Sequence, residues 1–439
     1  MDAFSLILQH VRDSMERQSI QGGVLIGFSG GADSTALLLA LHTLSKEKSI
    51  QIAALYVHHG LRDEAEQEAV FCRQTCEALG VPFYLRRVVV SRTGSTEAAA
   101  REARYAAFRE VMRDAGLSTL ALAHHMDDQA ETMLMHLMYG AGMDGLGGMQ
   151  EYRAPVWRPL LRCRREELRE ALRQLHQPWV EDSSNADSAY RRNAIRSRLI
   201  PEISALYPGA VPAMARSAEI LREESACLRD LCAAWLARSG AHGHWPFVLA
   251  EPLKAEPVAM QRRILRMYSE SLGLSLEFSQ TEELRSLADA PPGTRCNLPN
   301  GWHALRTQQR IHWISAIEAQ PVQWEPACIV QQCEKTGPGD GIHTQAVPHG
   351  LLEAAELRTR RPGDRIRPFG MQGSMKLKDY MISRRIDQPF RRDWPLLCRG
   401  SDVLWVIGVG ASELLRVSAQ SNDTVLISFS GDLPDALQN

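Results

Sequence analysis

A short apolar run that leads into a Ser-Gly-Gly turn constrains this chain more than any other feature. Residues 24–28 (VLIGF) predict a buried strand, and residues 29–34 (SGGADS) predict a turn followed by the start of a helix. Glycines let backbone N–H groups face a bound anion, and a helix N-terminus adds partial positive charge. The segment therefore predicts a phosphate-binding loop. The G-x-x-x-x-G-K-[ST] motif is excluded, because no Lys follows the glycines.

Composition indicates an ordinary globular chain. Its 439 residues are 44% hydrophobic and 23% charged, and the net charge is −2. At about 150 residues per domain, this length predicts two to four domains. No run reaches the roughly 18 apolar residues of a membrane span, and the N-terminus lacks the basic start of a signal peptide, so we expect a cytoplasmic protein. The nine cysteines form no C-x-x-C pair, which favours reduced thiols over a zinc or iron–sulfur site.

From residue 22 onward the chain alternates expected strands with expected helices. Several strands are continuous apolar runs, as in a parallel sheet covered on both faces, so right-handed crossovers predict a doubly wound α/β sheet. Ligands of such sheets lie beyond the carboxyl ends of the strands, where Ser29, His58, His59 and His124 are expected. The expected strands are 24–28, 52–57, 83–90 and 119–123, and the expected helices are 34–44, 64–79, 96–115 and 127–139.

The pattern changes after residue 148. Further helices are expected at 164–175, 213–238 and 253–272, and a linker rich in Pro, Gly and Gln at 321–350. Runs rich in β-forming residues near the C-terminus predict a small α+β module, at 403–409 and 424–429. We therefore expect three domains, which span residues 1–212, 213–320 (mostly helical) and 350–439.

Side chains in the predicted loop suit phosphate. Gly30 and Gly31 let the backbone approach the anion. The hydroxyls of Ser29 and Ser34 can donate to its oxygens. The carboxylate of Asp33 would repel phosphate, so either Mg²⁺ bridges it to the anion or it caps the helix.

Two further segments suit group-transfer chemistry. Arg101 and Arg104 are spaced i, i+3, and we select Arg104 to stabilise charge at a reacting phosphate, although a solvated helix face has the same pattern. Residues 123–132 (AHHMDDQAET) place two His and three acids at a strand-to-helix junction. Helix capping would also explain these acids, and a zinc site lacks further ligands. The Gly-rich residues 140–149 predict a mobile loop that closes over the cleft.

Two later segments are rich in groups that bind RNA. Residues 181–187 (EDSSNAD) and 190–196 (YRRNAIR) combine amides with guanidiniums, which hold single-stranded bases by hydrogen bonds and stacking. Residues 358–367 (RTRRPGDRIR), together with Lys376 and Lys378, indicate a local phosphate-facing surface in a chain of net charge −2. The structural alternatives are a capped helix and a solvated charged face.

Together these segments resemble one family, the bacterial tRNA(Ile)-lysidine synthetases of the ATP pyrophosphatase superfamily. The Ser-Gly-Gly-x-Asp-Ser loop marks only the superfamily, whereas the His-His-x-Asp-Asp and Glu-Asp-x-Ser-Asn-x-Asp runs are far more specific. One departure is His58, where many relatives carry Asn. The matching segments keep the family's order over most of the chain, at 29–34, 58–62, 97–105, 123–132, 142–149, 158–161, 181–196, 361–365 and 376–379.

The resemblance implies a reaction on isoleucine tRNA with a CAU anticodon. The C2 oxygen of the wobble cytidine would attack the α-phosphate of ATP and release pyrophosphate. The amine of free L-lysine would then attack C2, expel AMP and leave lysidine, which changes decoding from AUG to AUA. The resemblance also implies a sheet of the N-type ATP pyrophosphatase kind in residues 1–212, tRNA-binding roles for the two later domains, no membrane, and a homodimer as in some members.

The family's site residues map onto matching positions of this chain. ATP and its Mg²⁺ would be held by Ser29, Gly30, Gly31, Ala32, Asp33 and Ser34, with Asp33 as the metal ligand. Arg104 would contact the phosphates, His124 would lie near the reacting centre, and Asp128 would hold the lysine amine. Contacts with tRNA would come from Asp182, Asn185, Asp187, Arg191, Arg192, Asn193, Arg196, Arg361, Arg365, Lys376 and Lys378.

Three other classes of protein are the alternatives. A tRNA thiolase of the same superfamily would need suitably placed catalytic cysteines, and none is visible. An amidotransferase-type synthetase for NAD or GMP would need a glutaminase half. A non-enzymatic RNA-binding protein would need neither Asp33 nor the acidic cluster at 127–131.

Overall fold

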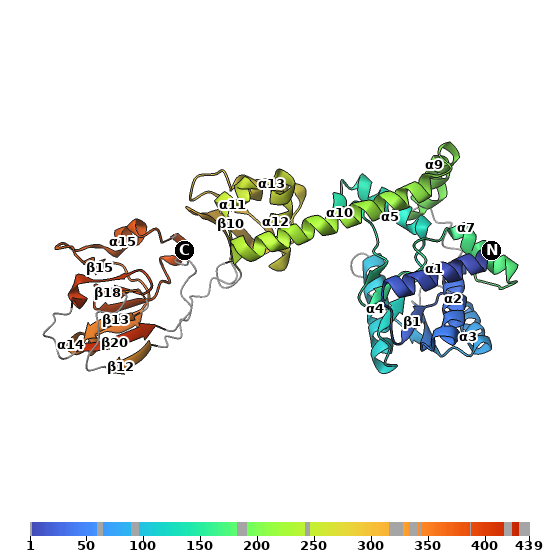
Figure 1. The fold of residues 1–439 in the computed structure, drawn as a ribbon, viewed down its shortest axis with the longest axis horizontal. Coiled ribbons are helices and arrows are strands. Elements are labelled where there is room, and N and C mark those ends of the chain that lie inside the picture. The colour runs from blue at the N-terminus through green and yellow to red at the C-terminus, as the bar shows by residue number, and fades with distance from the viewer. Residues whose placement is uncertain are drawn as a thin grey trace. The chain divides into compact units, whose positions relative to one another are not determined.

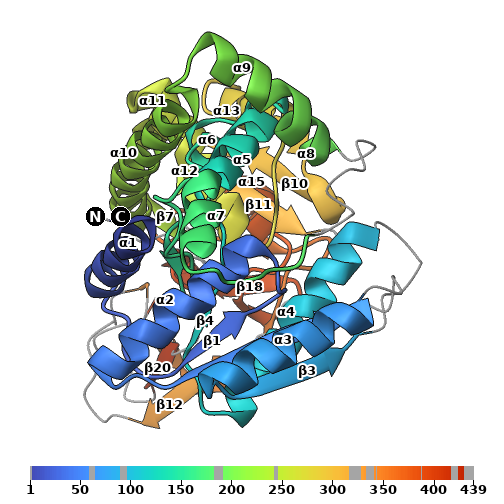
Figure 2. The same ribbon diagram turned by 90° about the vertical axis from the view of Figure 1, so that its right-hand side faces the viewer.

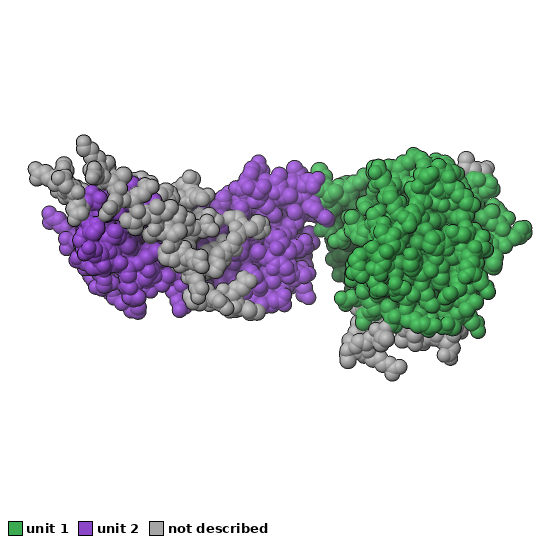
Figure 3. Space-filling model, turned by 90° about the horizontal axis from the view of Figure 1, so that it is seen from below, with its two compact units in different colours: residues 1–227 green, residues 228–439 purple. Residues whose placement is uncertain are grey.

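The computed structural model divides the chain into two compact units, residues 1–227 and 228–439 (Figure 3). Within the described ranges, no helix is long and apolar enough to cross a membrane. The structure describes residues 2–58, 65–88, 96–181, 191–241, 246–315, 328–332, 341–342, 344–386, 388–416 and 424–429.

The first unit is built on a six-stranded sheet in the order β3-β2-β1-β4-β6-β5. Strand β1 is labelled in Figure 1, and β1, β3 and β4 are labelled in Figure 2. Neighbouring strands are parallel from β3 to β6, and β5 adds an antiparallel edge. This confirms the expected doubly wound sheet, whose strand order reverses at β1, so that a ligand site is expected at the carboxyl end of that strand. The strands are β1 (Val24–Gly27), β2 (Ile52–His58), β3 (Phe83–Arg87), β4 (Thr119–Ala121), β5 (Tyr152–Arg153) and β6 (Val156–Trp157).

Helices cover both faces of the sheet, because alternate strand residues point to opposite sides. Val24 and Ile26 are buried in a core with α1, α2, α3 and α7, whereas Leu25 is buried with α4 on the other face. This explains why the strands read as continuous apolar runs. The helices are α1 (Ala3–Arg17), α2 (Ala32–Lys48), α3 (Ala65–Leu79), α4 (Thr96–Asp114) and α7 (Arg165–Gln174).

A second group of helices packs around α5. Ala130 of α5 is buried with Ile195 and Val211, which come from the segments that follow α8 and begin α10. Residues Ile195–Leu199 form a π-helical turn, a form that is frequent at functional sites. The helices are α5 (Met126–Met138), α6 (Met143–Leu146), α8 (Arg191–Ala194), α9 (Ile200–Leu206) and α10 (Ala210–Ser239).

The second unit opens with a five-stranded antiparallel sheet in the order β7-β8-β11-β10-β9. Tyr268 and Trp313 meet edge to face in its core, with ring centroids 4.7 Å apart. The strands are β7 (Gly240–Ala241), β8 (Phe247–Leu249), β9 (Arg295–Asn297), β10 (Trp302–Arg306) and β11 (Arg310–Ser315), and the helices are α11 (Ala250–Ala255), α12 (Val258–Ser271) and α13 (Phe278–Ser286).

The C-terminal part of this unit is an α+β module, as expected, but it begins earlier than predicted. The segment 321–350, which we expected to be a linker, contains β12 and β13, and both strands pair with β20 of the module. The module contains one sheet in the order β12-β20-β13 and a second in the order β14-β17-β18-β15-β16, with β19 paired to β18. Its elements are β12 (Cys328–Gln332), β13 (Thr344–Pro348), α14 (His349–Leu352), β14 (Glu356–Arg358), β15 (Arg365–Ile366), β16 (Met375–Lys376), α15 (Leu377–Ser383), β17 (Leu396–Arg399), β18 (Asp402–Val406), β19 (Gly410–Ala411) and β20 (Thr424–Phe429).

Other elements also differ from the sequence prediction. The structure adds helix α1, the β5–β6 hairpin and a sheet among the expected helices of residues 213–320. The helix expected at 253–272 is two helices, because Glu256, which precedes Pro257, is extended with ψ 153°. His59 and the predicted tRNA contacts Asp182, Asn185 and Asp187 lie outside the described residues.

A buried hydrogen bond between α1 and β6 gives a test of the core. Trp157 Nε1 donates to Ser14 Oγ at 2.9 Å, and both residues are fully buried. Ser14→Ala should lower the free energy of unfolding by about 1–3 kcal/mol, because it leaves the indole N–H unsatisfied. Urea denaturation measures the free energy of unfolding of this variant, of Trp157→Phe and of the double variant. The loss in the double variant should differ from the sum of the two single losses. Additive losses would contradict the role of the bond.

Candidate active site

Gly30 gives the loop between β1 and α2 its shape. Its φ is +80°, a conformation that residues with side chains rarely adopt, and a Cβ there would lie 3.1 Å from Cys72 Sγ and 3.2 Å from the Phe71 ring. The Gly30 carbonyl accepts the backbone N–H of Val180 at 2.9 Å, which ties the loop to the segment after α7. Gly31 has an ordinary φ of −68°. The loop therefore requires glycine at residue 30 for conformation and for space.

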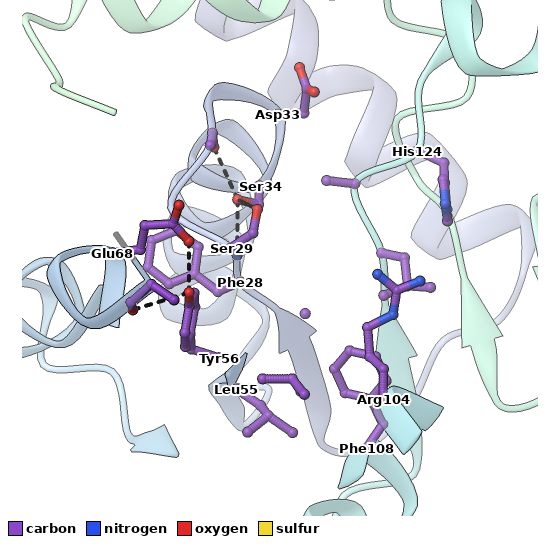
Figure 4. A pocket seen from close by; sticks show the side chains of 16 residues that line it. Phe28, Ser29, Asp33, Ser34, Leu55, Tyr56, Glu68, Arg104, Phe108 and His124 are labelled. Atoms are coloured by element: carbon purple, nitrogen blue, oxygen red, sulfur yellow. Dashed lines mark hydrogen bonds between the residues drawn. The ribbon is translucent and has the colours of Figure 1, made fainter. Parts of the chain in front are cut away.

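The two serine hydroxyls face each other across the loop. Ser29 Oγ and Ser34 Oγ are 3.1 Å apart, and Ser34 Oγ also receives the backbone N–H of Ser29 at 3.3 Å and donates to the Gly31 carbonyl at 3.0 Å (Figure 4). Ser34 is buried, whereas Ser29 is exposed. Ser34 thus fixes the turn. Since Ser34 donates its only hydroxyl proton to Gly31, the exposed Ser29 hydroxyl donates to Ser34 and would have to rotate to donate to a ligand.

A cavity of about 480 Å³ opens beside this loop, at the carboxyl ends of β1, β2 and β4 (Figure 4). Leu55 and Phe108 give part of its wall an apolar character, while Asp33, Arg104 and His124 supply charged and polar groups. Mostly apolar clefts with a few placed polar groups are typical of small-molecule sites. The cavity brings together three of the predicted catalytic residues and the predicted loop.

Asp33 does not cap helix α2. The N-cap is Gly31, and Asp33 lies in the first turn with its side chain at the cavity. Asp33 Oδ1 is buried and has no hydrogen-bond partner among the described residues. Within the same ranges, no group of three or more His, Cys, Asp or Glu side chains is arranged to hold a metal ion. A carboxylate oxygen with no protein partner fits Mg²⁺, which usually takes one or two carboxylates and completes its shell with phosphate oxygens and water.

His125 lies next to Asp33 and was not among the site residues predicted from the sequence. Its Nδ1 accepts the backbone N–H of Asp128 at 3.3 Å as the N-cap of α5, and its Nε2 lies 3.5 Å from Asp33 Oδ2. Burial would lower the pKa of His125, but the carboxylates of Asp33, Asp128 and Asp127 outweigh it and raise that pKa. Protonation of Nδ1 would break the helix cap, so the proton belongs on Nε2, facing Asp33. In the sequence, the adjacent residues His124 and His125 were the pattern that could have indicated this residue.

Arg104 from α4 and His124 after β4 point into the cavity from the side opposite the loop (Figure 4). Burial lowers the pKa of His124 to about 4, so this imidazole is neutral near pH 7. Burial and the neighbouring Arg101 lower the pKa of Arg104 from its ordinary value. The cavity thus combines a partly desolvated guanidinium with a neutral imidazole.

Asp128 and Glu131 form a buried acidic pair on α5, outside the lining of that cavity. Asp128 is 7% exposed and Glu131 is 1% exposed. Burial would raise the pKa of Asp128, but the charges of His125 and Arg192 outweigh it and lower that pKa. The pair is neutralised by two arginines, since Arg192 Nε and Arg196 Nε donate to Glu131 at 2.8 and 2.5 Å, and their Nη2 atoms donate to Asp128 Oδ1 at 3.3 and 3.0 Å.

Asp127 has a different role from its neighbour Asp128. Its carboxylate accepts from the Arg164 guanidinium at 3.0 Å and from the backbone N–H of Arg165 at 2.8 Å. Arg165 is the first residue of α7, so Asp127 joins the starts of α5 and α7. These bonds assign Asp127 to the scaffold.

The expected mobile loop at residues 140–149 is instead tied to two helices. It contains the short helix α6, and Gln129 of α5 both receives the Met149 N–H at 2.8 Å and donates to the Met149 carbonyl at 3.0 Å. Arg222 of α10 donates to the carbonyls of Gly147 and Met149 at 2.8 and 2.7 Å. Because the carbonyls of Gly147 and Met149 are bonded to α5 and α10, residues 140–149 do not have the structure expected of a loop that closes over the cleft.

The predicted C-terminal cations are on the surface of the second unit. Arg361 is 61% exposed and contacts Glu356, and Arg365 donates to Ser374. Lys376 and Lys378 are exposed. The turn that carries these cations is held by a buried ion pair between Arg358 and Asp364, at 2.8 Å, which the sequence prediction did not single out.

Comparison with known families and proteins agrees with this arrangement. A PP-loop domain matches residues 6–203, a TilS substrate binding domain matches residues 250–312, and a TilS substrate C-terminal domain matches residues 355–427. The first unit is therefore a PP-loop ATP pyrophosphatase domain, and the protein is an enzyme of the ligase type.

Curated relatives extend the match over most of the chain. A tRNA(Ile)-lysidine synthase of Geobacter sulfurreducens is 32% identical over 93% of each chain, and one of Pseudomonas syringae pv. tomato is 36% identical over 87% of each. The chain belongs to the tRNA(Ile)-lysidine synthase family. Among solved structures, the U34-tRNA thiolase NcsA from Methanococcus maripaludis is 19% identical, with a TM-score of 0.43 over 50% of this chain and 80% of that one.

The cysteines within residues 6–203, the range matched by the PP-loop domain, do not suit thiolase chemistry. Cys72 and Cys76 of α3 and Cys163 before α7 are buried. Burial raises the pKa of Cys76 and of Cys163 to about 12 and also raises the pKa of Cys72. A catalytic thiol needs the opposite shift, because the thiolate is the nucleophile.

Gly30→Ala tests the conformation of the loop. We expect the free energy of unfolding to fall by about 1–2 kcal/mol, because the alanine is forced into a left-handed conformation. Gly31→Ala is the matched control, since its added Cβ would have no neighbour closer than 3.6 Å. Chemical denaturation of both variants measures the difference, and equal losses would contradict the argument.

His124 gives a prediction for pH. Its pKa is about 4 in the folded chain against an ordinary value of 6.5, so the unfolded chain binds the extra proton between these values. The free energy of unfolding should therefore fall as the pH decreases from 6.5 to 4, by at most about 1.4 kcal/mol per pH unit from this group. His124→Asn should remove that part of the slope in denaturation at several pH values, whereas His349→Asn, at a 39% exposed side chain, should not. A wild-type slope in His124→Asn would contradict the burial of a neutral imidazole.

Proposed function

We propose that this chain uses ATP to adenylate the wobble cytidine of isoleucine tRNA with a CAU anticodon, and then joins lysine to C2 of that base. The observation that carries the proposal is a carboxylate oxygen of Asp33 that has no partner among the described residues and lies beside the glycine loop. A carboxylate at this position would repel a bare phosphate, and it suits a phosphate that brings its own cation. The named relatives, which are tRNA(Ile)-lysidine synthases, supply the choice of substrate.

In this proposal the cavity holds ATP. The backbone of residues 29–34 and the Ser29 hydroxyl bind the pyrophosphate part, and Mg²⁺ held by Asp33 would neutralise its charge. Arg104 stabilises the charge that develops at the α-phosphate. The neutral His124 can donate or accept one hydrogen bond next to that centre.

We further propose that lysine binds at the acidic pair. Asp128 and Glu131 carry two negative charges, and Arg192 and Arg196 carry two positive charges, within one set of contacts. Such a set complements an amino acid, because a carboxylate can accept from the guanidiniums while an ammonium donates to Asp128 or Glu131. The exposed cations Arg361, Arg365, Lys376 and Lys378 would bind the tRNA backbone.

Labelled lysine tests this function directly. Wild-type protein with ATP should incorporate lysine into a tRNA transcript with a CAU anticodon and not into the same transcript with UAU. The Asp33→Asn variant should lose incorporation by two orders of magnitude or more, since a neutral amide binds Mg²⁺ much more weakly than a carboxylate, while its tRNA affinity stays within about twofold.

Asp114→Asn is the control for that variant, because Asp114 is a 48% exposed carboxylate on α4. It should behave as wild type in incorporation and in tRNA binding. Full activity of Asp33→Asn, or equal labelling of the two transcripts, would contradict the proposal.

A further inference from the structure

Tyr139 is an exposed aromatic side chain at the end of helix α5. Tyr139 is 63% exposed, and the preceding Leu137 and Met138 are 57% and 65% exposed. Arg191 Nη1 donates to the Tyr139 hydroxyl at 2.6 Å, and the guanidinium lies 5.9 Å from the ring centroid. An open aromatic ring and a guanidinium are thus fixed next to each other.

Arg191 differs from the next two arginines of the same segment. Arg192 and Arg196 are both neutralised by the acidic pair on α5. Arg191 instead bonds to a neutral phenol, and among the described residues no carboxylate lies within ion-pair distance of it. Its positive charge is therefore available to a ligand.

Two other exposed aromatic rings with a nearby guanidinium lack this free charge. Phe278 is 71% exposed, but Arg262 beside it pairs with Glu282 at 2.6 Å. Phe369 is 56% exposed, and Arg416 beside it pairs with Glu413 at 2.6 Å. The Tyr139–Arg191 pair is thus the one of these three that combines an open ring with an unneutralised cation.

The position of the pair relates it to the acidic cluster. The segment that starts at Arg191 runs antiparallel to α5, since Arg191 contacts the end of that helix and Arg196 contacts Asp128 near its start. Tyr139 follows Asp128 by eleven residues, about 16 Å along the helix. A ring at that distance does not reach a base that reacts near Asp128, but it can reach another nucleotide of the same loop.

We propose that Tyr139 and Arg191 form a stacking platform for an unpaired base of the tRNA anticodon loop, other than the wobble base. The ring stacks on the base, and Arg191 binds an adjacent phosphate. Unpaired RNA bases are held in this way, by aromatic rings and guanidiniums that follow the backbone. This inference rests on the proposed function, because it assumes that the anticodon loop enters the site.

Variants of the full chain separate stacking from other roles of Tyr139. Tyr139→Leu keeps an apolar side chain but loses the ring, so KM for the CAU transcript should rise about tenfold or more while kcat changes little. Tyr139→Phe keeps the ring and loses the hydroxyl, and should stay within about threefold of wild type. Phe278→Leu is the matched control at an equally exposed ring, and its KM should not change.

A binding measurement does not depend on catalysis. Transcripts that carry 2-aminopurine at single anticodon-loop positions should show stacking-dependent quenching at one position with wild type and with Tyr139→Phe, and none there with Tyr139→Leu. An unchanged KM and unchanged quenching in Tyr139→Leu would overturn the platform, even if wild type incorporates lysine. If wild type quenches but incorporates no lysine, the proposed function fails and the platform stands.

Two other results would also overturn the platform. In the first, Tyr139→Phe loses as much tRNA affinity as Tyr139→Leu. This result would show that Tyr139 acts through its hydroxyl, by holding Arg191, and not by stacking its ring on a base. A change of oligomeric state in Tyr139→Leu, measured by light scattering, would make the exposed side chains an interface between copies of the chain.

Discussion

The imidazole of His125 links the starts of two helices that open toward the ligand sites. One nitrogen faces Asp33 in the first turn of α2, and the other accepts from the backbone of Asp128 in the first turn of α5. His125 is 1% exposed, so the ring itself is shielded from solvent. The separation of the phosphate loop from the acidic pair is therefore set by one buried ring. Both proposed half-reactions depend on that separation, because the lysine amine must reach the base that the ATP site activates.

The acidic pair shows how this arrangement depends on distant parts of the chain. A carboxylate as buried as Glu131 is unfavourable unless it is paired. Its partners Arg192 and Arg196 follow it by 61 and 65 residues, so the pair is neutralised only when the segment 191–199, which comprises α8 and the π-helical turn, has docked on α5. Docking of that segment and formation of the charged pocket are one event. The segment also carries Arg191 to the far end of α5.

Local sequence patterns predicted the parts of the fold that depend on local forces. The apolar runs of β1 and β2 and the glycine turn between β1 and α2 follow from burial and backbone conformation, and their positions were predicted closely. The role of His125 was missed, because a helix cap that also faces Asp33 needs the tertiary arrangement. The two-residue strands β5 and β6 have too few residues for a period to be recognised. Partners separated by more than 60 residues, such as Glu131 and Arg196, give no local signal at all.

The buried thiol of Cys72 has a consequence for the chemical durability of the enzyme. It lies against the α-carbon side of Gly30, where it occupies the space that a side chain would need. Because its pKa is raised, it stays protonated and reacts poorly with oxidants and alkylating agents. A sulfenic oxygen there would press on the loop that binds phosphate. Burial of the thiol therefore disfavours an oxidation that would distort this loop.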